Sequence, residues 1–200
     1  MELDKAIHTR CSVRWYKQEK ISKEAINELI AAGIRAPTAS GLENWLFVIY
    51  GERVNEKVWN LVKKGHIIYY RARNIPPEKM ELLKNRMDNG MYRAPVYIGV
   101  FINRNVRKLK GDEFAEHEFI MAVESAAMAI QNLMLKAVEM GLGTCYIGVA
   151  CFEEIERELK NMAELGDEYY LVGLISVGYP AEEVEPRKRK KTLNEVCKWV

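Results

Sequence analysis

The stretch EFAEHEFIMAVESAAMAIQNLMLKAVEM, residues 113–140, decides the fold, because it predicts a helix much longer than the elements around it. Its middle, residues 122–129, is rich in alanine and therefore small enough for another helix to approach closely. Glycines at positions 141 and 143 follow and end the helix. One long helix among shorter elements favours an α+β fold in which helices flank a sheet.

Strands and helices alternate outward from this helix. Short apolar, β-branched and aromatic runs predict strands over residues 45–50, 95–102, 144–147 and 169–177. Helical spacing and capping residues predict helices over residues 22–36, 54–62, 76–87 and 153–162. Residues 66–92 are only weakly patterned outside that third helix, so we interpret them as a cap or lid.

Length and composition indicate one globular domain over residues 1–200. With 48% hydrophobic and 29% charged residues the chain is not a disordered one. The net charge of +2 is too balanced for a protein that coats nucleic acid or an acidic membrane. The longest uncharged run, residues 169–181, is shorter than the roughly 20 residues of a membrane span. Charges among the first five residues argue against an export signal, and we expect a soluble, cytoplasmic protein.

Motifs for hydrolysis or metal binding fail on spacing. Ser176 is not centred in a G-x-S-x-G turn, and Met121 stands where a zinc-protease helix needs its second histidine. We therefore expect no catalytic dyad and no metal. The four cysteines form no C-x-x-C pair and are predicted to be free thiols: Cys11, Cys145, Cys151 and Cys197.

Two basic clusters lie at opposite ends of the chain. Arg10, Ser12 and Arg14 are spaced by two, so in an extended segment their side chains point the same way and can hold an anion. The plainer interpretation is a pair of surface arginines flanking a serine. The second cluster, residues 187–191, can equally be a solvated tail. Spacing alone does not decide between these interpretations.

Five motifs in series carry a resemblance that spans Ala6 to Val196. They are RCSVRWY (10–16), APTASGLENWLF (36–47), AIQNLML (129–135), GLGTCYIG (141–148) and GYP (178–180). Together they resemble the FMN-dependent nitroreductase family. The resemblance implies a three-layer α-β-α sandwich, with a mixed, mostly antiparallel sheet around the long helix. It also implies an intertwined homodimer with FMN at the subunit interface.

Site residues follow from the resemblance position by position. Arg10 and Ser12 would bind the FMN phosphate, and Arg14 the polar side of the flavin. Cys11 replaces the second arginine of the family's R-R-S-x-R motif. The basic C-terminal segment, residues 182–200, would close the phosphate grip through Arg189 with Arg187 beside it.

The remaining site residues would come from the partner subunit and from the end of a strand. In the resemblance, the partner's residues against the flavin rings are Pro37, Thr38, Ala39 and Ser40. Gly148 would meet flavin N5 through its backbone N–H, and Ile147 before it would also bind the cofactor. Where the family often has N-x-Q-P, this chain has Gly41, Glu43 and Asn44, so either Glu43 or Asn44 would meet flavin N3–H.

The activity implied is ping-pong hydride transfer. NADH or NADPH would reduce the flavin at N5, and an electron-poor small molecule such as a nitroaromatic or a quinone would reoxidise it. Three alternatives stay open: a reductive dehalogenase on the same scaffold, a flavin-fragmenting enzyme on it, and a flavin-binding protein without activity.

Overall fold

The sheet at the centre of the molecule has four strands in the order β1-β2-β4-β3 in the computed structural model, which describes residues 2–200. These strands are β1 (Trp45–Tyr50), β2 (Val96–Asn103), β3 (Gly143–Ile147) and β4 (Tyr169–Gly178). All three pairings between them are antiparallel. The expectation of a mixed sheet was wrong: the one parallel pairing in the described chain is an isolated bridge between Ser12 and Thr144. Each strand of the sheet therefore runs antiparallel to its neighbours.

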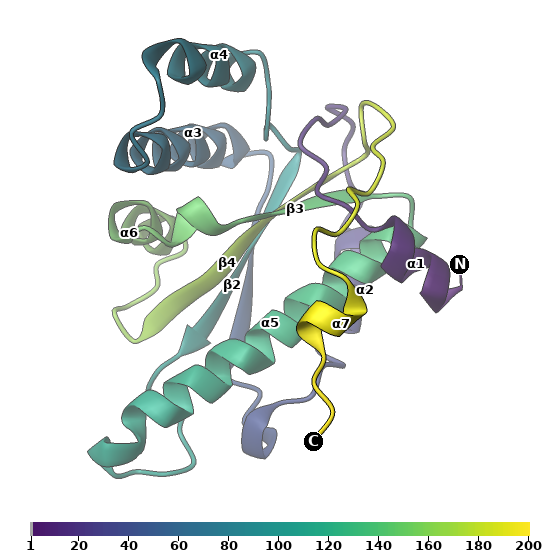
Figure 1. The fold of residues 1–200 in the computed structure, drawn as a ribbon. Coiled ribbons are helices and arrows are strands. Elements are labelled where there is room, and N and C mark those ends of the chain that lie inside the picture. The colour runs from purple at the N-terminus through teal and green to yellow at the C-terminus, as the bar shows by residue number, and fades with distance from the viewer. Residues whose placement is uncertain (1) are drawn as a thin grey trace.

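The long helix α5 (Ala115–Glu139) lies across one face of the sheet together with α2 (Lys23–Gly33) (Figure 1). The N–H of Ala25 donates to Ser22 Oγ at 3.1 Å, which caps α2 as predicted. A Cβ added to Gly33 would lie 3.4 Å from the carbonyl oxygen of Ala129. The alanine-rich middle of α5 thus admits a second helix, as the sequence indicated.

By length and composition alone, the continuous helical stretch Asp112–Glu139 is apolar enough to cross a membrane. A core helix of a globular protein meets the same test, and 44% of the most apolar window is buried inside the fold. We interpret the stretch as a core helix, because its inner side packs on the sheet.

The other face of the sheet carries α3 (Asn55–Ala72) and α6 (Glu153–Met162), with α4 (Pro77–Asp88) stacked outside α3 (Figure 1). Helices therefore cover both faces, and the three-layer expectation matches. The helix α3 extends ten residues past the predicted end at position 62. It includes the first part of the predicted lid, residues 66–72, and whether residues 66–92 act as a lid stays a prediction.

Short elements complete the chain. The helices α1 (Leu3–Thr9) and α7 (Leu193–Val196) lie near its ends and were not predicted from the sequence. Three single-turn helices connect longer elements: η1 (Ala39–Gly41), η2 (Asp112–Phe114) and η3 (Gly148–Cys151).

The two ends of the chain meet beside β3. Val13 N donates to the carbonyl of Thr144 at 3.0 Å, and Ala181 N donates to the carbonyl of Trp15 at 3.0 Å. Tyr16 forms a second, antiparallel bridge with Pro180. The segment after α1 is thus fixed between β3 and the chain that leaves β4, which sets the position of both basic clusters.

Candidate functional site

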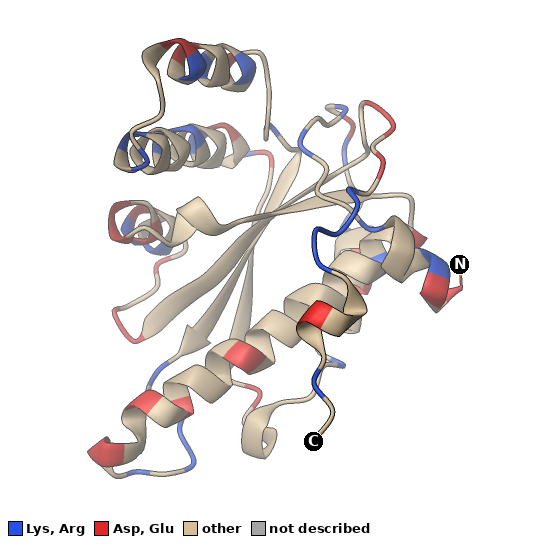
Figure 2. Ribbon diagram, in the orientation of Figure 1, with Lys and Arg blue, Asp and Glu red and all other residues tan. Residues whose placement is uncertain are grey.

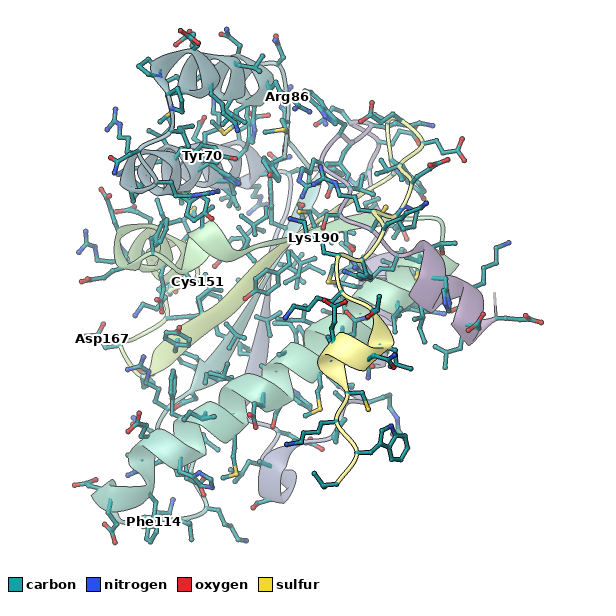
Figure 3. All side chains as sticks on the ribbon, viewed as in Figure 1. Tyr70, Arg86, Phe114, Cys151, Asp167 and Lys190 are labelled. Carbon is teal, nitrogen blue, oxygen red and sulfur yellow. The ribbon has the colours of Figure 1, made fainter. Side chains whose placement is uncertain are left out.

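A hollow of about 240 Å³ opens where the two chain ends meet. The N-terminal wall is formed by Arg10, Cys11, Ser12 and Arg14, and the C-terminal wall by Val184, Glu185, Pro186, Arg187 and Arg189. We call it the arginine pocket. Figure 2 shows the blue basic stretch of the C-terminal segment on the chain that leads into α7, and Lys190 of that stretch is labelled in Figure 3 but does not line the pocket. Residues separated by most of the chain therefore form one concave surface.

Positive charge in the arginine pocket is not neutralised by the chain itself. Within residues 2–200, no salt bridge joins Arg10, Arg187 or Arg189 to a carboxylate. Glu185 lines the pocket as well, but without an ion pair to any of these three. Guanidinium groups hold phosphate through paired, charge-assisted hydrogen bonds. The residues present thus fit an anionic group of phosphate size.

A buried cysteine neighbours the N-terminal wall of the pocket. Burial raises the pKa of the Cys145 thiol, although Arg14 and Ser12 oppose the shift. A neutral thiol leaves the nearby guanidinium charge unpaired. Cys11 turns its Sγ toward the carbonyl of Val184 at 3.4 Å, so it joins the two walls. All four cysteines are free thiols, as predicted.

Arg14 is held by two acceptors inside the protein. Its Nε–H donates to the hydroxyl of Tyr92 at 3.2 Å, and one terminal N–H donates to the carbonyl of Ser12 at 3.2 Å. Burial opposes the charge on Arg14, yet the neighbouring Cys145 and Tyr92 raise its pKa overall. Tyr92 was missed by sequence reasoning, because only the tertiary fold brings the end of the predicted lid to the N-terminal segment.

The segment expected to come from a partner subunit lies elsewhere in the protomer. Pro37, Thr38, Ala39, Ser40 and Glu43 do not line the arginine pocket. They form the η1 turn against α5, where Ala39 N donates to Ser125 Oγ at 3.1 Å and Glu43 N donates to Thr38 Oγ1 at 3.0 Å. Ser40 and Glu43 adopt positive φ angles of 53° and 46°. One protomer therefore does not unite both groups of predicted residues.

Gly148 stands at the open end of β3. Ile147 before it is buried, whereas Gly148 is exposed and begins η3. A Cβ added to Gly148 would meet only Tyr146 Cε1, at an ordinary 3.5 Å. By contrast, a Cβ on Gly65 of α3 would lie 2.9 Å from the carbonyl of Val149, so α3 holds η3 firmly. Internal packing does not demand the glycine at position 148, which leaves its backbone open to a group approaching from outside.

Two further observations limit the chemistry. Among residues 2–200, no group of three or more His, Cys, Asp and Glu side chains is placed to hold a metal ion. A larger hollow of about 580 Å³ lies beside β1 and α2 and contains none of the predicted site residues. Lys20 and Glu52, both on its wall, form an ion pair at 3.0 Å. We assign the site to the smaller pocket, because its arginines have no carboxylate partners in the part of the chain that the structure describes.

Comparison with known proteins identifies the family of this chain. The model of the nitroreductase family matches residues 7–179. The chain belongs to the nitroreductase family. It is 25% identical over 179 residues to an Archaeoglobus fulgidus protein named "Putative NADH dehydrogenase/NAD(P)H nitroreductase", covering 90% of this chain and 86% of that one. The family and the names of such relatives make this nitroreductase-family chain an enzyme of the NAD(P)H nitroreductase type.

Solved structures show the same fold. A BluB-like flavoprotein from Clostridium difficile is 28% identical and covers 100% of this chain and 99% of its own, with a TM-score of 0.73. A nitroreductase with bound FMN from Desulfitobacterium hafniense has the same coverage and TM-score at 18% identity. At that identity the second likeness concerns the fold alone. The α+β sandwich with its long central helix is therefore a nitroreductase fold.

Proposed function

We propose that this nitroreductase-family enzyme binds FMN and passes hydride from NADH or NADPH to an electron-poor small molecule such as a nitroaromatic or a quinone. The observation that carries the proposal is the arginine pocket, where both ends of the chain place guanidinium groups around one hollow. In the described part of the chain, Arg10, Arg187 and Arg189 have no carboxylate partner. The family membership and the FMN bound by structural relatives support the same cofactor.

In this proposal the chain binds and orients the cofactor. Arg10, Ser12, Arg187 and Arg189 would hold the phosphate, and Arg14 would face the polar edge of the flavin rings. The exposed backbone N–H of Gly148 would meet the N5 edge. When bound, FMN supplies the redox centre that accepts and returns hydride. The protein needs no catalytic dyad for this, in keeping with the failure of the hydrolytic motifs.

The proposal includes a cytoplasmic homodimer. Apolar side chains without cover line the outer side of α5 and the C-terminal segment, namely Ile120, Met128, Leu193, Val196 and Trp199. A second copy would bury them and would bring its η1 turn, with Pro37 to Ser40, to the flavin. Sedimentation of the FMN-loaded protein tests this directly, and a loaded monomer would contradict it.

The deciding experiment is an anaerobic titration of the purified protein. A flavin absorption spectrum that bleaches with NADH or NADPH and returns on adding a quinone or nitroaromatic supports the proposal. Bound flavin that neither nucleotide bleaches indicates a flavin-binding protein without this activity. Flavin that is bleached but reoxidised only by a halogenated aromatic indicates a reductive dehalogenase, and loss of the flavin after oxygen is admitted to the reduced protein indicates a flavin-fragmenting enzyme. Protein that takes up no FMN overturns the proposal.

A further inference from the structure

Tyr92 is held in an unfavourable backbone conformation next to the arginine pocket. Its φ is 66°, a left-handed value that bulky residues seldom adopt, and its side chain is buried. Its N–H donates to the carbonyl of Arg14 at 2.7 Å, and its own carbonyl accepts from the hydroxyl of Tyr97 at 2.7 Å. Strain of this kind persists where the surrounding structure fixes it and concentrates at functional sites.

The side chain of Tyr92 bridges the predicted lid and Arg14. Its hydroxyl accepts from Nε of Arg14, and its ring stacks on His66 of α3 with centroids 4.4 Å apart and an interplanar angle of 26°. His66 is itself fixed, because its Nδ1 lies 2.9 Å from the carbonyl of Val62. Tyr92 is therefore wedged between a rigid helix and one particular guanidinium group.

The N–H groups that Arg14 does not use inside the protein show what its bond to Tyr92 achieves. A guanidinium group has five N–H donors, and Arg14 uses one on Tyr92 and one on Ser12. The other three stay available for a ligand. Because the group is planar, fixing Nε also fixes the plane in which those three donors lie.

We propose that Tyr92, backed by His66, is a positioning residue that sets the plane of Arg14 against the polar edge of the flavin. It couples the end of the α3–α4 segment to cofactor binding through this one guanidinium. The inference rests on the proposed function, since it assumes that Arg14 faces the flavin. Tyr70 and Arg86, labelled in Figure 3, lie on the two helices of this segment, and the ring of Tyr70 lies 5.8 Å from the ring of His66, which backs Tyr92.

The test removes one hydroxyl. In Tyr92→Phe the dissociation constant of FMN should rise about tenfold, the order expected when a hydrogen bond to a charged group is lost. The midpoint potential of the bound flavin should become more negative, because a misaligned cation stabilises the reduced, anionic ring less well. The matched control is Tyr50→Phe, which removes an equally buried hydroxyl that donates to the carbonyl of Leu159 at 2.9 Å. It should lower the melting temperature while leaving FMN affinity and potential unchanged.

Repeating Tyr92→Phe in a protein that lacks the Arg14 side chain distinguishes a positioning role of Tyr92 from a purely structural one. Arg14→Ala should still bind measurable FMN through the phosphate grip, and adding Tyr92→Phe to it should then change the dissociation constant no further. The inference is overturned if Tyr92→Phe binds FMN at wild-type affinity and potential. It is also overturned if Tyr92→Phe weakens binding equally with and without Arg14. Failure of the wild-type protein to bind FMN would instead strike at the proposed function.

Discussion

Two arginine-rich hollows in this molecule treat their charges in opposite ways. Among residues 2–200, the arginine pocket leaves Arg10, Arg187 and Arg189 without carboxylate partners. The second hollow, about 450 Å³ in volume, is lined by Arg104 and Arg107 beside η2. Both of these arginines have partners within the chain.

In the second hollow the partners are two aromatic rings and one carboxylate. The Arg104 guanidinium lies 4.8 Å from the ring of Phe119 and 4.9 Å from that of Tyr170. Arg107 reaches Asp112 at 3.7 Å, and the buried Glu118 accepts from the backbone N–H groups of Lys108 and Leu109. These contacts fix a loop. Arginines with partners inside the chain stabilise the fold, whereas those of the smaller pocket are left for a ligand. The pairing of the charged side chains therefore identifies the candidate site better than the volume of the hollow does.

The largest expected effect tests whether only the arginine pocket binds the cofactor, and it is measured by removing one arginine from each hollow. Arg10→Ala should weaken FMN binding by about 1.5–3 kcal/mol, because a charge-assisted bond to phosphate is lost. Arg107→Ala should leave FMN affinity unchanged. Fluorescence titration with FMN measures both, and titration with riboflavin, which lacks the phosphate, should show little effect of Arg10→Ala. Equal FMN affinity in all three proteins would remove Arg10 from the site.

A substitution next to the second hollow should lower stability and leave FMN affinity unchanged. Glu118→Ala removes the buried acceptor of two backbone N–H groups, and losing these hydrogen bonds to a charged group should lower the free energy of unfolding by about 1.5–3 kcal/mol. Denaturant unfolding measures this loss, with FMN affinity as the control that should not move. A stable Glu118→Ala protein with weakened FMN binding would reverse the roles we assign to the two hollows.

A smaller effect tests whether the two walls of the arginine pocket share one ligand. If Arg10 and Arg189 grip the same phosphate, their losses should be coupled by about 0.5 kcal/mol or more, of either sign. Comparing both single variants and the double variant at fixed ionic strength gives this coupling. Strict additivity would mean separate roles, and wild-type affinity in Arg189→Ala would return residues 187–191 to the solvated-tail interpretation.

The smallest expected effect concerns pH. Burial, followed by the charge of Arg14, lowers the pKa of His66 in the folded state. The unfolded chain therefore takes up this proton first, so the stability associated with neutral His66 is complete above the unfolded pKa of about 6.5 and is lost as the pH falls toward the folded value. Melting temperatures between about pH 7.5 and about pH 5.5 should fall more steeply in the wild type than in His66→Phe, which keeps an aromatic ring against Tyr92. Parallel slopes would show that His66 does not titrate in this window.

Local patterns predicted a helix or strand well wherever the apolar residues kept one regular spacing, helical or strand-like, throughout the segment. The strand at residues 45–50 and the helix at residues 153–162 were placed to the residue. The end of α3 was missed, because His66 and Tyr70 are held by tertiary stacking on and around Tyr92 rather than by a regular apolar spacing. The sheet was expected to be mixed because strand direction came from the resemblance, and local sequence carries no direction signal.

For the site, the sequence located both basic clusters and the structure brings them to one hollow. Arg187 and Arg189 line it, but their grip on phosphate stays a prediction. Val184, Glu185 and Pro186 were not anticipated, since they reach the pocket only through the path of the chain after β4. Tyr92 was likewise invisible, because its bond to Arg14 joins residues 78 positions apart.

The arginine pocket also orders events during synthesis. A chain emerges from the ribosome with its N-terminus first. Arg10 and Arg14 are therefore made early, whereas residues 184–189 follow the last strand, β4. The sheet and its helices can assemble before the C-terminal wall exists, but the pocket cannot. Any anion that needs both walls will therefore be captured only after residues 184–189 have left the ribosome.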